Sequence, residues 1–333
     1  MKLVIPLAGY GTRMRPHTYV RPKPLINVAG KPVLAHILDR FQAFDVEEAV
    51  FIVGHLGEQV AEYVDTHYHF PVTRYVEQRE LKGQSHALWL AREYLKGPLF
   101  IVFVDTIFDG DLQVVHRTDA DGIAFVKEVE DPRRFGVAVT DAEGRVLRFI
   151  EKPDTMEHRL AVIGLYWIRE GEQLVDAIRE LLERDIQTKG EYYLADALQI
   201  MIDRGALFRT QRMEVWQDCG TIPATIETNR YLLEHGEAND AGRTFPHSVI
   251  IPPCYIGEDV TIEGSVVGPY ATILDHATVR DAIVRDSIIG AAAVVESALV
   301  EKSIIGEKAH IRGQFQSYNV ADTSWIRVAE ESS

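Results

Sequence analysis

A short glycine-rich segment near the start of the chain has the features of a phosphate-binding loop. Gly9 and Gly11 follow an apolar run, and Arg13 stands two residues further along. Backbone N–H groups at such a turn before a helix attract phosphate, and glycine lets the backbone approach it closely. The segment is not a dinucleotide-binding fingerprint, because Met14 replaces its third glycine, and it lacks the Gly-Lys-Ser/Thr of a Walker A loop. Taken alone, it is equally consistent with a tight strand-to-loop turn.

Charged residues accompany this loop. Lys23 lies within Pro22-Lys23-Pro24-Leu25, where the prolines predict an extended stretch that lets it reach back over the turn beside Arg13. Two cations bracketing a glycine turn suit a triphosphate and its pyrophosphate leaving group. Asp105 closes an apolar run at residues 99–104, and carboxylates at such strand ends line the ligand crevice of an open α/β sheet.

The opening motif resembles that of the sugar nucleotidyltransferases and is most similar to the glucose-1-phosphate thymidylyltransferases. The resemblance rests on Gly9-x-Gly11-Thr12-Arg13-Met14-x-Pro16-x-Thr18 with Lys23-Pro24 downstream, and it extends over the N-terminal domain. It implies catalytic roles for Arg13 and Lys23. The implied nucleotide-binding residues of this loop are Ala8, Gly9, Gly11 and Thr12.

The resemblance assigns roles to two further pairs of residues. Gln78 and Gly83 have the spacing with which the family recognises a pyrimidine base, since an amide offers a donor and an acceptor and glycine exposes backbone groups. Asp105 and Asp218 match the family's metal carboxylates and imply Mg²⁺, which takes one or two carboxylates and completes its shell with phosphate and water. Without the resemblance, Gln78 belongs to a polar loop and each aspartate is a common turn or cap residue.

Segments in the second half of the domain imply the sugar side of the site. In Glu151-Lys152-Pro153 the family uses the lysine, a third catalytic residue, on the sugar phosphate and the glutamate on sugar hydroxyls. A Glu–Lys pair at a strand end is otherwise a surface ion pair of little energetic value, and Glu191 is equally suited to helix capping. The implied sugar-binding residues are Gly136, Glu151, Val162, Tyr166 and Glu191.

One segment departs from the family pattern. The family places glycine before the metal aspartate and asparagine after it, whereas this chain has Val104-Asp105-Thr106. Because the carboxylate is kept, the change bears on the identity of the sugar more than on activity.

The elements that hold these residues in place form a predicted α/β domain over residues 1–236. Apolar runs at residues 3–7, 49–53, 99–104 and 123–126 predict buried strands. Helical spacing at residues 34–44, 88–95 and 174–182 predicts helices between them, which favours a Rossmann-like, mixed and mostly parallel sheet covered on both faces. Residues 135–140 and 145–150 predict a hairpin inserted in that sheet.

The sequence beyond a polar linker at residues 234–244 changes in texture. Aliphatic–glycine pairs such as Ile256-Gly257 and Ile289-Gly290 are each followed by another aliphatic residue six positions on. This period predicts a hexapeptide-repeat, left-handed parallel β-helix over residues 246–328 with the aliphatics facing its core. This predicted β-helix, which ends in residues 318–328, adds to the resemblance, because the long branch of the thymidylyltransferases has a similar C-terminal domain. An all-β sandwich is the alternative.

Composition narrows the classes of function. The net charge of −15 over 333 residues, without a long basic run, argues against a nucleic-acid partner. No apolar stretch has the length of a signal peptide or membrane span, so no membrane association is expected. Cys219 and Cys254 are the two cysteines, which argues against a disulfide framework or structural zinc and favours a reducing cytoplasm.

The resemblance therefore implies transfer of a nucleotidyl group from dTTP or UTP to a sugar 1-phosphate, first of all glucose 1-phosphate. An N-acetylglucosamine-1-phosphate uridylyltransferase and a catalytically silent regulatory relative are the alternatives. A further interpretation adds acyltransferase activity in the β-helix, where His247, His276 and His310 are available without an evident partner. A homo-oligomer is expected, because a stack of coils exposes a face and an end that need covering.

Overall fold

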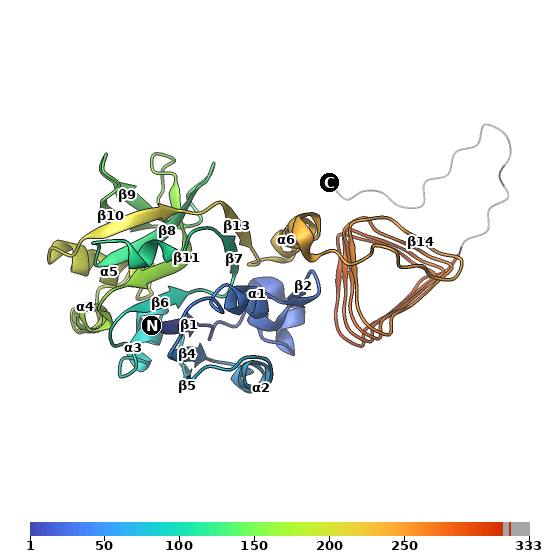
Figure 1. The fold of residues 1–333 in the computed structure, drawn as a ribbon, viewed down its shortest axis with the longest axis horizontal. Coiled ribbons are helices and arrows are strands. Elements are labelled where there is room, and N and C mark those ends of the chain that lie inside the picture. Colours follow the sequence, from blue (N-terminus) through green and yellow to red (C-terminus); the bar gives the residue numbers. More distant parts are fainter. Residues whose placement is uncertain (316–319, 321–333) are drawn as a thin grey trace. The chain divides into compact units, whose positions relative to one another are not determined.

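The first of two structural units is built on a mixed nine-stranded sheet (Figure 1). The computed structural model describes residues 1–315 and 320, so the predicted stretch at residues 318–328 lies outside the described residues. The chain divides into Met1–Ala238 and the residues from Asn239 onward. The strands of the large sheet are β1 (Lys2–Pro6), β4 (Glu48–Val53), β5 (Val72–Glu77), β6 (Leu99–Val102), β8 (Gly122–Glu128), β9 (Gly136–Thr140), β10 (Val146–Glu151), β11 (Leu160–Ile168) and β12 (Phe208–Arg212).

The order of the strands places the amino-terminal strand in the interior of the sheet. The path runs β10-β9-β11-β6-β1-β4-β5, and β8 pairs with both β11 and β12. Strand β1 is parallel to β4 and to β6, while β11 is antiparallel to β6, β8 and β9. The predicted hairpin is β9–β10, which is antiparallel. The carboxyl ends of β1 and β6 therefore lie side by side in the sheet.

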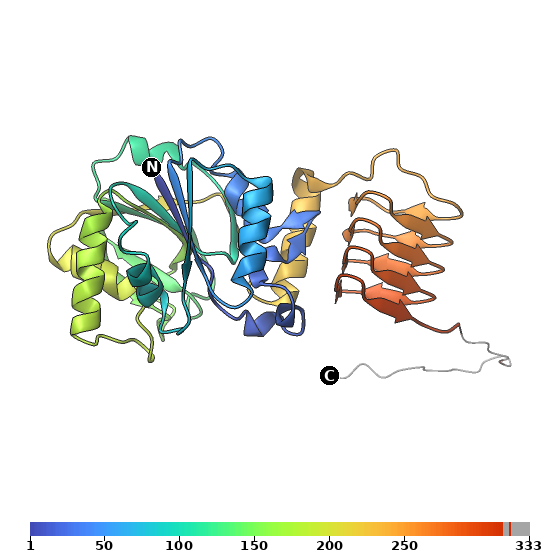
Figure 2. The ribbon, with the colours of Figure 1, turned by 90° about the horizontal axis from the view of Figure 1, so that it is seen from below.

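Helices cover both faces of this sheet (Figure 2). The helices are α1 (Val33–Asp39), α2 (Gly57–His67), α3 (Gln84–Leu90), α4 (Gly171–Glu183), α5 (Leu194–Asp203) and α6 (Ile222–Leu232). Two small ribbons complete the unit, namely β2 (Asn27–Val28) with β3 (Lys31–Pro32), and β7 (Thr106–Asp109) with β13 (Val215–Asp218). Short 3-10 helices lie at Thr12–Met14, His17–Tyr19, Lys23–Leu25 and Gln113–His116, and a π-helical turn at Leu233–Glu237 follows α6.

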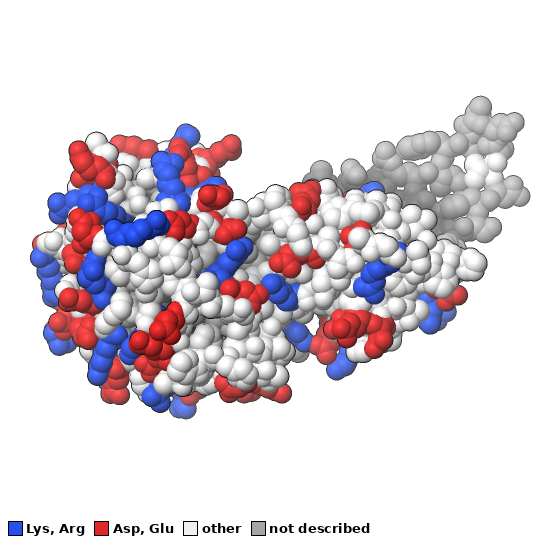
Figure 3. All heavy atoms as spheres, viewed as in Figure 1, with Lys and Arg blue, Asp and Glu red and all other residues white. Residues whose placement is uncertain are grey.

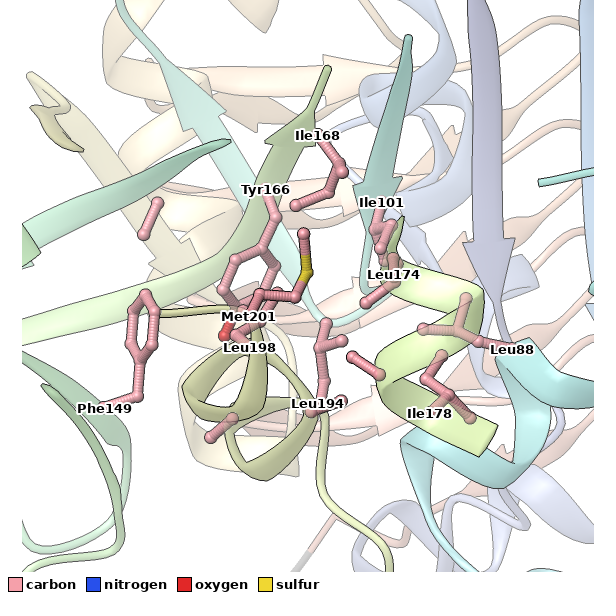
Figure 4. Packing of buried hydrophobic residues seen from close by; sticks show 14 of the residues in the cluster. Leu88, Ile101, Phe149, Tyr166, Ile168, Leu174, Ile178, Leu194, Leu198 and Met201 are labelled. Atoms are coloured by element: carbon pink, nitrogen blue, oxygen red, sulfur yellow. The ribbon is translucent and has the colours of Figure 1, made fainter. Parts of the chain in front are cut away.

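The core explains why the apolar runs form the central strands. Val4 and Ile101 point to the face covered by α3, α4 and α5, where they join a buried cluster with Leu88 (Figure 4). Phe100, next to Ile101, points to the opposite face, where its ring centroid lies 5.1 Å from that of Phe41. Strands buried on both faces read as continuous apolar runs, as the sequence predicts.

Several predicted element boundaries are wrong, and three of them bear on the core and the site. The strand predicted to reach residue 104 ends at Val102. The backbone N–H of Phe103 still donates to the Gly164 carbonyl on β11, and the chain turns at Val104 and Asp105. The helical spacing over residues 34–44 continues past the end of α1 at Asp39, since tight turns keep Phe41 facing the core. Helix α3 ends at Leu90, and turns carry the apolar spacing on to residue 95.

The second unit is a parallel β-helix, drawn as a stack of triangular coils in Figure 1. Its three four-stranded parallel sheets run β14-β17-β20-β23, β15-β18-β21-β24 and β16-β19-β22-β25. Ile256, Ile273 and Ile289 stand in register, are fully buried and fill equivalent core positions, as predicted. The strands are β14 (Val249–Ile250), β15 (Cys254–Ile256), β16 (Thr261–Glu263), β17 (Val266–Val267), β18 (Ala271–Ile273), β19 (Thr278–Arg280), β20 (Ile283–Arg285), β21 (Ile288–Ile289), β22 (Val294–Glu296), β23 (Leu299–Glu301), β24 (Ile304–Ile305) and β25 (His310–Arg312).

The surface charges, the helix lengths and the β-helix histidines give little further information about the function. On the face drawn in Figure 3, the Lys and Arg side chains of the first unit are interspersed with Asp and Glu. Among the described residues, no helix combines the length and apolarity needed to cross a bilayer. Of the β-helix histidines considered for acyl transfer, His276 lies 3.7 Å from the Asp259 carboxylate, and both side chains are largely exposed.

Candidate active site

Three adjoining cavities lie where β1 and β6 end. They share Phe103, which follows β6 and lines all three. The loop after β1 supplies Gly9 to two of them, and Asp105 lines two as well. A crevice beyond the carboxyl ends of parallel strands is the usual ligand site of an open α/β sheet.

The first cavity, here the loop cavity, is formed by the glycine segment. Gly9, Gly11, Thr12, Arg13 and Lys23 all line it. A side chain on Gly9 would meet open space, so its backbone faces the cavity, whereas Gly11 has a left-handed φ of 59° that suits glycine. The chain then enters the 3-10 helix Thr12–Met14. The helix predicted after the glycine turn is therefore only this short 3-10 turn.

Lys23 reaches the loop cavity by a different route from the one predicted. Instead of an extended stretch, Lys23–Leu25 forms a 3-10 helix whose Lys23 carbonyl accepts from the Ile26 N–H at 3.1 Å. The Lys23 Nζ donates to Asp105 Oδ2 at 3.1 Å. Burial raises the pKa of the Asp105 carboxyl, but the positive charges of Lys23 and Arg13 outweigh this and hold that pKa below its usual value. Asp105 is therefore an anion in the cleft.

Asp218 reaches the same place through the β7–β13 ribbon. Asp218 pairs with Thr106 in that ribbon, and the next backbone N–H, that of Cys219, donates to the Asp105 carbonyl at 2.9 Å. The Gly220 N–H donates to Asp218 Oδ1 at 2.7 Å. A Cβ on Gly220 would lie 2.7 Å from this oxygen and 3.3 Å from Arg13 Nη2, so glycine leaves room for the guanidinium beside the aspartate.

The second cavity, here the base cavity, contains the predicted base-recognition pair. Ala8, Gly9, Gln78 and Gly83 line it together with Leu81. Gln78 is buried, and its Nε2 donates to the Gly83 carbonyl at 3.4 Å. Gly83 has a φ of 106°, and a Cβ there would lie 2.6 Å from the Tyr192 carbonyl oxygen. Only glycine allows this packing, which fixes the loop next to the amide of Gln78.

The third cavity, here the sugar cavity, lies between β9, β10 and β11. Gly136, Glu151, Val162 and Tyr166 line it with Asp105 and Asp218. Gly136 stands opposite Glu151 in the β9–β10 ladder, and a Cβ on Gly136 would lie 3.0 Å from Glu151 Oε2. Burial raises the pKa of the Glu151 carboxyl, although the neighbouring charge of Lys152 opposes the shift. A partly desolvated carboxyl of this kind is suited to accept hydrogen bonds from hydroxyl groups.

Comparison with known proteins decides the family. The profile of the family described as nucleotidyl transferase matches residues 2–235. The chain belongs to the nucleotidyl transferase family. It is 30% identical over 314 residues to a glucose-1-phosphate thymidylyltransferase of Streptomyces antibioticus, and the match covers 87% of each chain. It is 31% identical over 241 residues to the UTP–glucose-1-phosphate uridylyltransferase AglF of Haloferax volcanii, covering 70% of this chain and 97% of that one.

A solved structure supports the fold of this nucleotidyl transferase. A UDP-glucose pyrophosphorylase complexed with UDP-glucose is similar with a TM-score of 0.61 at 21% identity, over 70% of this chain and 98% of that one. At this identity the likeness bears on the fold alone.

Two of the predicted site residues lie elsewhere than their roles suggest. Glu191, predicted on the sugar, lines the base and loop cavities instead. Lys152 lines none of the three cavities. Its Nζ donates to the Tyr193 hydroxyl at 2.9 Å and lies 3.7 Å from Glu151 Oε1, which itself lines the sugar cavity. The other predicted residues are all brought to the cleft of this nucleotidyl transferase.

The sequence did not point to several residues that line the sugar cavity. Arg134, Phe135 and Trp216 lie there, and the rings of Phe135 and Trp216 meet edge to face with centroids 4.8 Å apart. The adjacent Arg133 pairs with Asp131, whereas Arg134 has no ion pair among the described residues. The one available signal was proximity in sequence, because Arg134 precedes Gly136 and Trp216 precedes Asp218.

The departure from the family pattern at Thr106 has a structural role. Thr106 is buried at 2% exposure, and its hydroxyl donates to the Ile163 carbonyl at 2.6 Å. The same oxygen accepts from the Trp216 indole N–H at 2.6 Å. Thr106 therefore joins two walls of the sugar cavity beside Asp105.

Proposed function

We propose that this chain transfers a nucleotidyl group from dTTP or UTP to a sugar 1-phosphate, glucose 1-phosphate first of all, and releases pyrophosphate. One observation carries the proposal: Asp105 and Arg13 line both the loop cavity and the sugar cavity, and Asp218 lines the sugar cavity with them. A triphosphate on the glycine loop and a sugar phosphate in the adjoining cavity would meet at these two carboxylates. The names of the relatives support the same reaction class.

The residues present suit positioning and charge neutralisation. An oxygen of the sugar phosphate attacks the α-phosphorus, the bond from that phosphorus to the bridging oxygen breaks, and pyrophosphate leaves with the electron pair. A phosphate monoester is already ionised at neutral pH, so the reaction needs no general base, and alignment supplies much of the rate. Arg13, the loop amides and Lys23 would hold the leaving pyrophosphate, while Lys152 would hold the attacking phosphate.

The carboxylates also fit Mg²⁺, which we propose as the cofactor. Lys23 contacts one oxygen of Asp105 and the Gly220 amide contacts one oxygen of Asp218, so each carboxylate offers its second oxygen to a cation. Mg²⁺ takes one or two protein carboxylates and completes its shell with phosphate and water, so this pair is sufficient. When bound, Mg²⁺ would neutralise charge on the phosphates.

Pyrophosphate release tests this proposal. The purified chain is mixed with each of four nucleoside triphosphates and a panel of sugar 1-phosphates, with N-acetylglucosamine 1-phosphate beside glucose 1-phosphate. We expect release with a pyrimidine nucleotide. Thymine and uracil differ by one methyl group, worth about 1–3 kcal/mol in a pocket. We therefore expect release with both dTTP and UTP, at different rates. No release with any pair would indicate the silent regulatory relative.

Two variants test whether the positive charges of Arg13 and Lys152 take part in the reaction. Arg13→Ala and Lys152→Ala should each lower the turnover number by about two orders of magnitude or more, because interactions with a transferring phosphate are worth several kcal/mol. Neither should change the melting temperature appreciably. A loss of stability that matches the loss of activity in Arg13→Ala would assign Arg13 a structural role instead.

We also propose a cytoplasmic homo-oligomer. Both cysteines are free and buried, which fits a reducing compartment. On the β14-β17-β20-β23 sheet, the outward residues Val249, Val266, Ile283 and Leu299 stand in register as an aliphatic stripe, and Leu299 is 82% exposed. A second copy that covers this stripe would remove it from water.

Light scattering tests the oligomer. Leu299→Asp should lower the mass in solution, whereas the control Thr278→Asp on another sheet of the β-helix should not. An unchanged mass in Leu299→Asp would exclude the stripe as the contact.

A further inference from the structure

Lys152 is held beside the sugar cavity by a neutral group. Its ammonium donates to the Tyr193 hydroxyl at 2.9 Å and lies 5.0 Å from the centroid of that ring. The nearest carboxylate oxygen, Glu151 Oε1, is further away at 3.7 Å. The lysine thus has a neutral partner and an anionic partner within reach, and it makes its hydrogen bond to the neutral one.

The ring that holds Lys152 is firmly placed. Tyr193 is 6% exposed and stands at the N-terminus of α5, and its carbonyl accepts from the Ser85 hydroxyl at 2.9 Å. A buried ring anchored through its own backbone cannot follow the lysine, so the position of the hydroxyl is fixed.

The backbone of Lys152 is fixed as well. It adopts a left-handed φ of 46°, which is unfavourable for a residue with a long side chain. Its N–H donates to the Phe135 carbonyl at 3.0 Å, and its own carbonyl accepts from Lys189 Nζ at 3.3 Å. Phe135 lines the sugar cavity, so the strained backbone is tied to the wall of that cavity.

We propose that Tyr193 is a positioning residue for Lys152: its hydroxyl holds the ammonium beside the sugar cavity and keeps the 3.7 Å ion pair with Glu151 from closing to hydrogen-bond distance. The inference rests on the proposed role of Lys152 in holding the sugar phosphate. A full ion pair with Glu151 would cancel the charge that the phosphate needs and occupy the carboxylate that faces the sugar. A phenol oxygen satisfies the ammonium without neutralising it, and an incoming phosphate dianion displaces a neutral acceptor more easily than a carboxylate.

The test removes the hydroxyl alone. In Tyr193→Phe, the dissociation constant for glucose 1-phosphate, measured by calorimetry, should rise by about three- to tenfold, the worth of one such hydrogen bond. Its KM in pyrophosphate release should rise in parallel, while the KM of the nucleotide stays unchanged. The matched control is Tyr192→Phe, because the neighbouring Tyr192 hydroxyl donates to Asp185 at 2.5 Å and Tyr192 lines none of the cavities. This control should bind glucose 1-phosphate as the wild type does.

A double-mutant cycle separates this inference from the proposed function. In a Lys152→Ala background, Tyr193→Phe should have no further effect on the binding of glucose 1-phosphate, because the hydroxyl then has no ammonium to hold. Additive effects would show that Tyr193 acts independently of Lys152 and overturn the inference. If Lys152→Ala weakens binding but Tyr193→Phe does not, the role of Lys152 stands and that of Tyr193 falls. A wild type that binds glucose 1-phosphate without releasing pyrophosphate would refute the proposed function, while the calorimetric cycle would still decide the role of Tyr193.

Discussion

Thr106→Val tests whether the walls of the sugar cavity are joined through one hydroxyl. Valine keeps the shape of the side chain but removes an oxygen that is bonded at 2.6 Å to both the Ile163 carbonyl and the Trp216 indole. Each buried group that loses its partner costs about 1–3 kcal/mol. Because Trp216 is only partly buried, we expect a total loss of about 2–4 kcal/mol in the free energy of unfolding.

The assay combines a melting curve with kinetics. For a unit of this size, 1 kcal/mol corresponds to about 2–4 °C, so the melting temperature of the first unit should fall by about 4–16 °C. The KM of the sugar 1-phosphate should rise, because Ile163 and Trp216 line its cavity. Thr210→Val is the control, since Thr210 lies on the edge strand β12. Within the part of the chain that the structure describes, its hydroxyl makes no hydrogen bond. If Thr106→Val melts within a degree of Thr210→Val, the hydroxyl does not join the walls.

Three further predictions concern protonation, metal and backbone. Burial lowers the pKa of His36 to about 4, from 6.5 in the unfolded chain, so its stabilising contribution is complete above pH 6.5 and is lost as the pH falls. The free energy of unfolding, measured by urea denaturation, should therefore be about 2 kcal/mol lower at pH 5 than at pH 7. His36→Gln should largely remove this difference. Chelation with EDTA should abolish pyrophosphate release, and Asp218→Asn should raise the Mg²⁺ concentration needed for half-maximal rate by about tenfold or more; a metal-independent rate would contradict the cofactor proposal. Gly164 has a φ of 81°, and a Cβ there would lie 3.2 Å from that of Phe103. Gly164→Ala should therefore lower the free energy of unfolding by at least about 1 kcal/mol and raise the KM of both substrates. Normal kinetics would show that Phe103 does not couple the cavities.

Local patterns predicted the repetitive parts of the fold well. The β-helix repeats one short pattern, so the period of six between aliphatic residues was sufficient to place Ile256, Ile273 and Ile289 in the core. The apolar run before Asp105 correctly predicted burial, but burial does not determine where strand pairing stops. That boundary depends on the turn at Val104 and Asp105 and on the neighbouring strand β11, which is distant in sequence and whose pairing with β8 changes register between Val162 and Tyr166.

The wrong local prediction at Lys23 has a similar physical cause. Proline fixes φ near −65°, a value compatible both with an extended chain and with a 3-10 turn. Pro22 is extended, and the turn begins directly after it at Lys23. The Lys23–Asp105 bond accompanies the turn, and Asp105 is 82 residues away, so no local pattern could have chosen between these conformations.

The segment at residues 103–106 connects the proposed sugar site to the aspartate that we propose as a metal ligand. Phe103 lines all three cavities, Asp105 lines two of them, and Thr106 joins Ile163 to Trp216. These residues follow one another directly, so we expect a substitution at Thr106 to affect the position of Asp105 as well. Trp216 is coupled in the same way to Asp218, because both belong to the ribbon that pairs with β7. We therefore expect that a change of sugar would need matched changes on both strands of the ribbon, and the hydrogen bond between Thr106 and Trp216 is one such matched pair.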